Sequence, residues 1–169
     1  EGHYGVSLLN DCKYGHSALD GVMTLTLIKS GIEPNPTADQ EEHTFTYALY
    51  PHAEGWRQAN TVQEAMKLNQ PLLSEEGGHA GCQNSFVWVD KSNVIIETVK
   101  MAEDNDGIIV RLYESENAKT KAHLFFGEKV SSVESCNCLE EIKQTIETDG
   151  EGFEITIKPY EIQTYRVRF

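Results

Sequence analysis

The strongest constraint on the fold is a rhythm of short apolar stretches that runs from residue 86 to the C-terminus. In each stretch apolar and polar residues tend to alternate, as in strands with one buried face. Turn signals such as Asp-Lys-Ser at 90–92 and Thr-Asp-Gly-Glu-Gly at 148–152 separate them. This spacing is typical of an antiparallel β-sandwich. The predicted strands are 86–89, 94–101, 108–114, 121–126, 130–136, 153–158 and 160–168.

Alternation also predicts which side chains face the core of this sandwich, because successive residues of a strand point to opposite faces. The stretch 139–146 is too short for its period to establish a helical turn, so its structure stays open. The predicted inward residues are Ile108, Val110, Leu112, Ala122, Leu124, Phe126, Phe153, Ile155 and Ile157.

In the first 75 residues, strands are predicted at 6–9, 22–28 and 43–49, separated by longer irregular connections. The connection around residues 15–21 reads as a loop, and the prolines at 34 and 36 exclude regular structure from 30–42. We expect the third strand to stop at Pro51, because proline cannot donate a ladder hydrogen bond.

One helix is expected in the chain, over residues 56–69. Trp56, Ala59, Val62 and Met66 recur there at helical spacing, and Pro71 follows the segment. Thr61 and Glu64 have the spacing of a capping box. The fold class is therefore mainly β, an antiparallel sandwich with one short helix.

A glycine-rich polar stretch divides the chain. We place a linker at 76–83, an N-terminal part at 1–75 and the sandwich at 84–169.

Charge and cysteine content exclude several functions. The net charge of −13 disfavours nucleic acid and anionic membrane surfaces, which are bound through lysine and arginine. No apolar run approaches the roughly 20 residues of a membrane-spanning helix. Four cysteines are too few for a disulfide scaffold, so we expect reduced thiols and a cytoplasmic location. The start of the chain lacks Met and signal-peptide features, so we expect a piece of a longer protein.

The run Asp-Asn-Asp-Gly at 104–107 resembles the start of a calcium loop. With Gly107 at position six, Ala102 and Tyr113 fall where such a loop needs acidic ligands. The run therefore predicts a hairpin turn.

No catalytic or cofactor signature appears elsewhere. Cys136 with Cys138, and His79 with Cys82, are only fragments of a zinc pattern. The glycines at 77–81 lack the order and flanking elements of a nucleotide cradle, and no nucleophile elbow is present.

Two polar stretches remain as a candidate ligand site. One follows the first predicted strand, and the other, at 39–43, precedes the third. Both gather residue types that hydrogen-bond hydroxyl-rich ligands, although solvated loops between strands have the same composition. The candidates of the first stretch are Asn10, Asp11, Lys13, Tyr14 and Gly15.

These stretches carry a resemblance to a known family. Val-Ser-Leu-Leu-Asn-Asp-Cys-Lys-Tyr-Gly at 6–15, the block at 38–52 and the closing block at 153–167 are similar to the C-terminal part of the glycoside hydrolase family 38 α-mannosidases. The likeness is to their bacterial and fungal cytoplasmic branch. It extends over the helix at 65–72 and the strand at 94–100.

The resemblance implies a retaining, exo-acting glycosidase with two carboxylates and a zinc ion in an N-terminal α/β barrel. No residue here matches that barrel, so no nucleophile, acid/base or metal ligand is assigned to this chain. Residues 1–75 would be the tail of a large mutarotase-like sandwich, and 84–169 a small terminal one. The segment 10–15 would match a loop at the rim of the active site, where it would meet a mannoside substrate.

A different class stays open: a free-standing sandwich that binds carbohydrate or protein. Against it, Trp56 and Trp88 are expected in the core rather than on a sugar-binding surface. The resemblance implies that a catalytic barrel normally covers part of this chain. Without the barrel that surface is exposed, so we also expect the chain to self-associate as a homo-oligomer.

Overall fold

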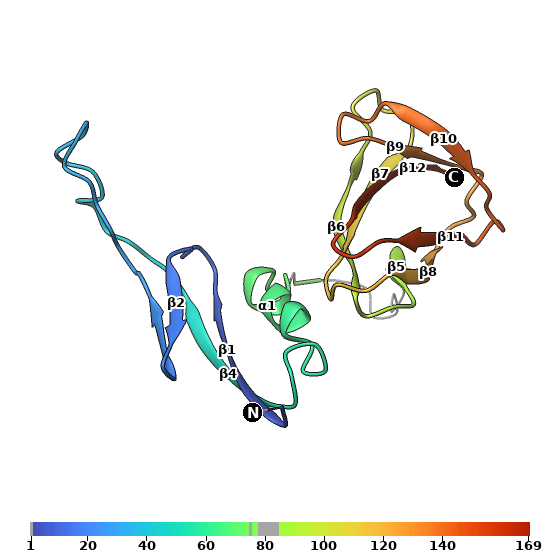
Figure 1. The fold of residues 1–169 in the computed structure, drawn as a ribbon. Coiled ribbons are helices and arrows are strands. Elements are labelled where there is room, and N and C mark those ends of the chain that lie inside the picture. Colours follow the sequence, from blue (N-terminus) through green and yellow to red (C-terminus); the bar gives the residue numbers. More distant parts are fainter. Residues whose placement is uncertain (1, 75, 78–84) are drawn as a thin grey trace. The chain divides into compact units, whose positions relative to one another are not determined.

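The computed structural model describes residues 2–74, 76–77 and 85–169 (Figure 1). Most of the predicted linker, with His79 and Cys82, lies outside these residues. The chain divides into two compact units, Glu1–Glu75 and Glu76–Phe169, and each is described by itself.

The second unit is an antiparallel sandwich of two sheets that face each other (Figure 1). One sheet has five strands in the order β10-β9-β12-β7-β6, and the other has three in the order β11-β8-β5. The mainly β fold class is therefore confirmed. The strands are β5 (Val87–Val89), β6 (Val94–Met101), β7 (Ile108–Glu114), β8 (Thr120–Phe126), β9 (Ser132–Cys136), β10 (Ile142–Ile146), β11 (Gly152–Ile157) and β12 (Ile162–Arg168).

The core of this sandwich consists of the alternate residues that the sequence predicts. Every predicted inward residue is buried except Ile108, which is partly buried and packs against the others. Because each fully buried aliphatic or aromatic side chain contributes about 1.5–3 kcal/mol, this cluster is the main stabilising feature of the unit. It consists of Val94, Val110, Leu112, Ala122, Leu124, Phe126, Val130, Val133, Phe153, Ile155, Ile157, Tyr165 and Val167.

The turn at 104–107 joins β6 to β7 as predicted. Asn105 has a φ of 61° and Gly107 a φ of 92°, and Met101 pairs with Ile108 directly below the turn. Asp104 and Asp106 bind Arg166 and Arg168 at 2.6 and 2.9 Å. Both carboxylates thus serve the fold.

Residues 142–146 form strand β10, so the possible helical turn at 139–146 is wrong. Ile142 pairs with Cys136 and Ile146 with Val133, with a register shift between the two pairs. Pairing along the edge of a sheet supplies backbone hydrogen bonds that a short sequence window does not reveal.

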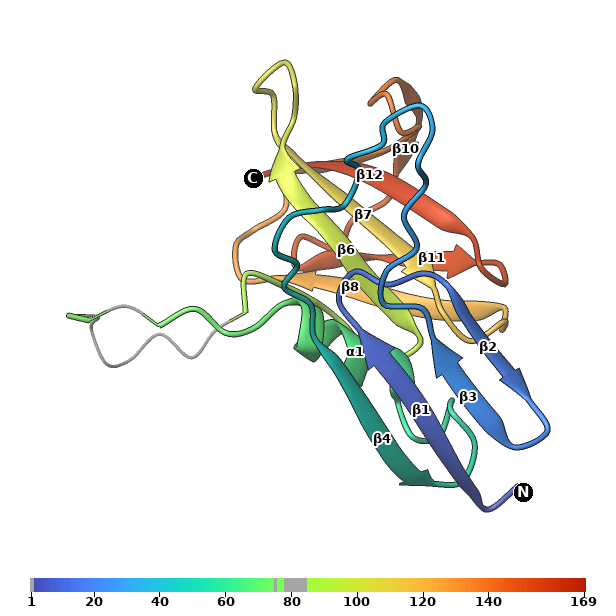
Figure 2. The ribbon, with the colours of Figure 1, turned by 90° about the vertical axis from the view of Figure 1, so that its left-hand side faces the viewer.

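The first unit contains two small antiparallel sheets and one helix. β1 (Tyr4–Asn10) pairs with β4 (Tyr47–Ala53), and β2 (His16–Leu19) pairs with β3 (Val22–Leu25). Figure 2 shows the β2–β3 hairpin beside β1. Residues 26–46 carry no helix or strand, which agrees with the expected irregular connection at 30–42.

Several predictions for the strands of this unit differ from the structure, and β1, predicted over 6–9, extends from Tyr4 to Asn10. Residues 16–19 form a strand where a loop was expected, because Asp20 and Gly21, with φ of 50° and 76°, make a tight hairpin turn. β3 ends three residues early, at Leu25. β4 begins at Tyr47 and continues through Pro51, which pairs with Val6. A two-stranded sheet has open edges, where a missing N–H is tolerated.

The helix α1 (Thr61–Asn69) is shorter than predicted and ends before Pro71 as expected. Asn60 precedes it with a φ of 51° and no side-chain cap, so the predicted capping box is wrong. The Thr61 hydroxyl instead lies 3.0 Å from that of Ser7 on β1.

Neither tryptophan lies in a core, contrary to expectation. Trp56 precedes the helix and is 37% exposed, and Trp88 is 43% exposed. On β5 it is Val87 and Val89 that pack against the core cluster, so Trp88 points to the opposite face.

The first unit encloses almost no core. Among residues 2–74, Leu9 is the only buried hydrophobic side chain. A unit of this size normally buries many apolar side chains, so these residues do not by themselves form a closed hydrophobic core. Of the helices in the described part of the chain, none is long and apolar enough to cross a membrane.

Candidate functional site

The rim loop, residues 10–15, connects β1 to β2 and has a fixed backbone. The Lys13 N–H donates to Asn10 Oδ1 at 2.6 Å, which closes a turn. The Asn69 side chain, at the end of α1, donates to Asn10 O at 3.2 Å. At the other end, the Thr26 N–H donates to Gly15 O at 2.7 Å. The loop is therefore held by the helix on one side and by the residue after β3 on the other.

Asp11 attaches the rim loop to the residue before β4. Its N–H donates to Thr46 O at 3.2 Å, and its Oδ2 accepts the Thr46 N–H at 2.8 Å. Hydrogen bonds from the Cys12 thiol and the Thr46 N–H lower the pKa of Asp11. The same contact with Asp11 raises the pKa of the Cys12 thiol. At neutral pH the loop thus carries a carboxylate next to a protonated thiol.

Of the remaining candidates, Lys13 is partly buried and Tyr14 is exposed. Lys13 Nζ lies 4.6 Å from the centre of the Phe45 ring, a cation–π contact. Tyr14 is 88% exposed at the tip of the loop. Tyr14 is therefore the candidate whose side chain is open to solvent.

The second predicted stretch, 39–43, closes on itself. His43 Nε2 donates to Asp39 O at 3.0 Å, and Gln40 Nε2 donates to Pro36 O at 3.1 Å. The contacts to the rim loop come from the next residues, Phe45 and Thr46. The two residues before β4 therefore contact the rim loop, whereas the predicted residues 39–43 do not supply these contacts.

A cavity of about 220 Å³ separates the end of β1 from the β2–β3 hairpin, and Asn10 is the rim candidate that lines it. His16 and a pair of hydroxyls, Ser17 Oγ and Thr24 Oγ1, 2.7 Å apart, also line it. Sequence reasoning missed the last three residues. The Asp-Gly pair at 20–21 was the available signal, because it predicts the hairpin that brings Ser17 opposite Thr24.

A hydroxyl–imidazole pair in the first unit was also missed. Ser7 Oγ donates to His52 Nε2 at 3.0 Å, since the other ring nitrogen donates to Glu54 O at 3.2 Å. Thr61 Oγ1 lies 3.0 Å from the same serine. These contacts join β1, β4 and α1, and we interpret them as a structural junction.

The described residues do not fit a zinc site. They contain no group of three histidine, cysteine, aspartate or glutamate side chains that could hold a metal ion. Cys12, Cys136 and Cys138 are free thiols, and burial raises the pKa of Cys136. No step of a reaction can be assigned to a metal in this part of the chain.

Fold and geometry thus define a class: a terminal β-sandwich preceded by a sheet unit with an ordered polar loop. Two family models match, in chain order. The glycosyl hydrolases family 38 C-terminal domain matches residues 1–37, and the glycosyl hydrolases family 38 C-terminal beta sandwich domain matches residues 93–165. The chain belongs to the C-terminal region of glycosyl hydrolase family 38, as the sequence resemblance implied.

Curated relatives agree. The chain is similar to alpha-mannosidase G of Dictyostelium discoideum, with 34% identity over 96% of this chain and 16% of the relative. It is also similar to alpha-mannosidase 2C1 of Mus musculus, with 31% identity over 95% of this chain and 16% of the relative. An alpha-mannosidase of Saccharomyces cerevisiae is 30% identical over 98% of this chain and 17% of its own length. The chain therefore spans about a sixth of these relatives.

A solved structure of a glycosyl hydrolase family 38 protein from Enterococcus faecalis has a similar fold, with a TM-score of 0.71 and 21% identity. It matches 98% of this chain and 21% of the other chain. At this identity the likeness concerns the fold alone.

Proposed function

We propose that the chain is the non-catalytic C-terminal part of a retaining, exo-acting α-mannosidase that removes terminal α-D-mannosyl residues. In this role it supports an N-terminal catalytic barrel of the same polypeptide, and the rim loop borders the active site. The observation that carries the proposal is the match of both family 38 C-terminal models, in order, together with relatives named alpha-mannosidases.

The small number of buried apolar side chains in the first unit supports the proposal that other protein segments pack against it. With Leu9 as the one buried hydrophobic side chain among residues 2–74, its sheets need further protein to cover them. The rest of the large sandwich and the barrel would provide that cover, and a second copy of the chain would do so when they are absent. Large apolar side chains exposed in this unit include Leu19, Val22, Ile32, Leu49, Leu72 and Leu73.

We assign the two carboxylates and the zinc ion of the parent enzyme to the barrel, as the family resemblance implies. The rim loop supplies hydrogen-bonding groups of the kind that recognise sugar hydroxyls, held in position by Asp11 and Asn10. We place the parent enzyme in the cytoplasm, an assignment supported by the free thiols of the described cysteines.

The first prediction concerns the chain alone, which should not hydrolyse an aryl α-mannoside in the presence of zinc. The physical reason is that retaining hydrolysis needs a nucleophile and an acid/base carboxylate about 5 Å apart across the glycosidic bond. Release of the phenol is measured against a buffer blank, with the parent enzyme as the positive control. Turnover above the blank by the pure chain would contradict the proposal.

The second prediction concerns the rim loop in the intact parent enzyme. Replacing Tyr14 with alanine removes a side chain that is 88% exposed, so folding should be unaffected. If the phenol contacts the mannoside, KM should rise about tenfold, which corresponds to about 1.4 kcal/mol. Tyr4→Ala is the matched control, since Tyr4 is also exposed but begins β1, at the opposite end from the rim loop. Unchanged KM and kcat in Tyr14→Ala would remove this role.

A further inference from the structure

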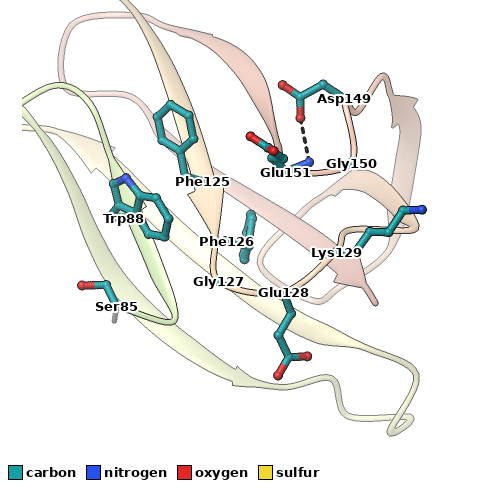
Figure 3. A pocket seen from close by; sticks show the side chains of 10 residues that line it. All are labelled: Ser85, Trp88, Phe125, Phe126, Gly127, Glu128, Lys129, Asp149, Gly150 and Glu151. Carbon is teal, nitrogen blue, oxygen red and sulfur yellow. Dashed lines mark hydrogen bonds between the residues drawn. The ribbon is translucent and has the colours of Figure 1, made fainter. Parts of the chain in front are cut away.

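A pocket of about 980 Å³ lies on the terminal sandwich, far along the sequence from the rim loop (Figure 3). Its aromatic side comes from β5 and β8, and its polar side from the turns at 127–129 and 149–151. Its volume is at the upper end of the range of small-molecule sites. The role proposed above for this chain in the parent enzyme does not involve this pocket.

The aromatic side is a stacked pair. The rings of Trp88 and Phe125 lie 5.4 Å apart with an interplanar angle of 11°, and the two residues are paired across β5 and β8. Phe125 also contacts the His123 ring at 4.2 Å and is partly buried, so Trp88, which is 43% exposed, is the more exposed ring of the pair. The strand partner of Phe125 on its other side is Gly152, which has no side chain to extend over the ring.

The polar side is ordered by Asp149. Its Oδ1 accepts hydrogen bonds from the N–H groups of Glu151 and Gly152 at 2.9 and 2.8 Å. These bonds fix the turn that precedes β11, and Figure 3 shows the one to Glu151. Glu151, Glu128 and Lys129 are exposed around the pocket. The two turns together therefore present carboxylate acceptors and one ammonium donor near an aromatic surface.

We propose that this pocket binds a neutral hexopyranose. A pyranose ring has an apolar face that packs on an indole, and its hydroxyls bind carboxylates and ammonium groups, so both sides of the pocket are matched. Three carboxylates against one ammonium among the lining residues disfavour phosphorylated and acidic sugars. A quaternary ammonium ligand needs several aromatic faces around the cation, whereas the rings of Trp88 and Phe125 are stacked on each other.

This proposal does not depend on the catalytic role of the parent enzyme. Only the choice of a mannoside as the first sugar rests on the proposed function. A pocket that binds sugar would hold the enzyme on a glycan without taking part in hydrolysis. Hydrolysis of the aryl mannoside and sugar binding by the terminal sandwich are therefore measured in separate experiments, and either result can fail without the other.

The test uses the whole chain, titrated separately with methyl α-D-mannopyranoside, methyl α-D-glucopyranoside and methyl α-D-galactopyranoside and followed by amide NMR shifts. We expect saturable shifts at Gly127 and Gly150 for at least one sugar, with a Kd on the order of millimolar. Trp88→Ala should weaken that binding at least tenfold, whereas Trp56→Ala, in the other unit, should leave it unchanged. Glu151→Gln should weaken it several-fold while retaining the fold.

The results that would overturn the proposal are equally definite. One is the absence of saturable shifts with all three sugars. Another is binding that persists unchanged in Glu151→Gln and in a folded Trp88→Ala. A third is a pocket that responds to choline and to none of the sugars. If Trp88→Ala fails to fold, Trp88→Leu and Glu151→Gln decide the matter.

Discussion

Replacing Glu114 with alanine should destabilise the terminal sandwich by about 3–4 kcal/mol. Glu114 ends β7 and is fully buried, with 0% exposure. Its Oε1 accepts from Asn93 Nδ2 at 2.9 Å and from the Glu116 N–H at 2.8 Å. Its Oε2 accepts the Tyr160 N–H at 3.0 Å. Alanine would remove the acceptor from three partly buried hydrogen bonds at once.

The size of this effect follows from the connections that Glu114 joins. Asn93 precedes β6, Glu116 follows β7 and Tyr160 precedes β12. One carboxylate therefore joins three of the connections between strands. Asn93 also donates to Thr120 Oγ1 at 2.7 Å, which extends the network to β8. Because each unsatisfied buried donor costs about 1–3 kcal/mol, this site outweighs any exposed ion pair of the unit.

The pH dependence of the same variant provides a second measurement. Burial alone would raise the pKa of Glu114, but the hydrogen bonds from Tyr160, Asn93 and Glu116 outweigh burial and lower it. A carboxylate with a lowered folded-state pKa stabilises the fold above its unfolded-state pKa, about 4.3 for glutamate. That stabilisation is lost as pH falls through the folded-state value. The gap between wild type and Glu114→Ala should therefore be full at pH 7 and shrink below about pH 4.

Urea unfolding at pH 7, followed by the fluorescence of Trp88 in a Trp56→Phe background, gives both free energies. Glu154→Ala is the matched control, because Glu154 is exposed and only pairs with Lys121 at 2.7 Å. Its effect should stay within about 0.5 kcal/mol. Equal stabilities for the two variants would show that the Glu114 network does not stabilise the sandwich.

The sequence predicted the sandwich well because apolar residues alternate along the sequence with the same two-residue period as buried side chains along a strand. Residues 94–101 and 108–114 alternate in sequence, and the observed strands have these bounds. Leu112, Leu124 and Ile157 were predicted to face inward and have 0% exposure. In a two-sheet fold the buried face is set by alternation alone, so a local pattern is enough.

Elements whose stability comes from a partner strand were harder to predict. β10 has exposed residues along most of its length, so no buried face marks it in the sequence. β2 is exposed throughout, and only its hairpin turn could have revealed it. The exposure of Trp88 was missed because the flanking valines, not the tryptophan, belong to the core. Amino-acid type suggested burial, whereas strand register determined it.

The rim loop was identified from its composition and its family likeness, and neither could show how it is held. The contact of Asp11 with Thr46 joins residues 35 positions apart in the sequence. Such a pairing follows from the register of β1 with β4, which places Asn10 opposite Tyr47. That register brings the polar ends of the two strands together, and the candidate site is a consequence of it.

The core of the sandwich gives the other large effect. Replacing Ile157 with alanine should destabilise the unit by about 2–5 kcal/mol, because the side chain has 0% exposure and its loss leaves a cavity. Ile162→Ala makes the same chemical change on the neighbouring strand in sequence, where the side chain is 62% exposed. Its effect should be below about 1 kcal/mol.

This pair of variants separates burial from strand propensity, since isoleucine is replaced by alanine in a strand in both. β12 lies inside its sheet, between β9 and β7, whereas β11 is at the edge of the other sheet. If backbone propensity dominated, the central strand β12 would be at least as sensitive as β11. If packing between the sheets dominates, Ile157→Ala must be the more costly by at least 1 kcal/mol in the same urea titration. An equal loss in both variants would mean that the two sheets do not enclose the core described above.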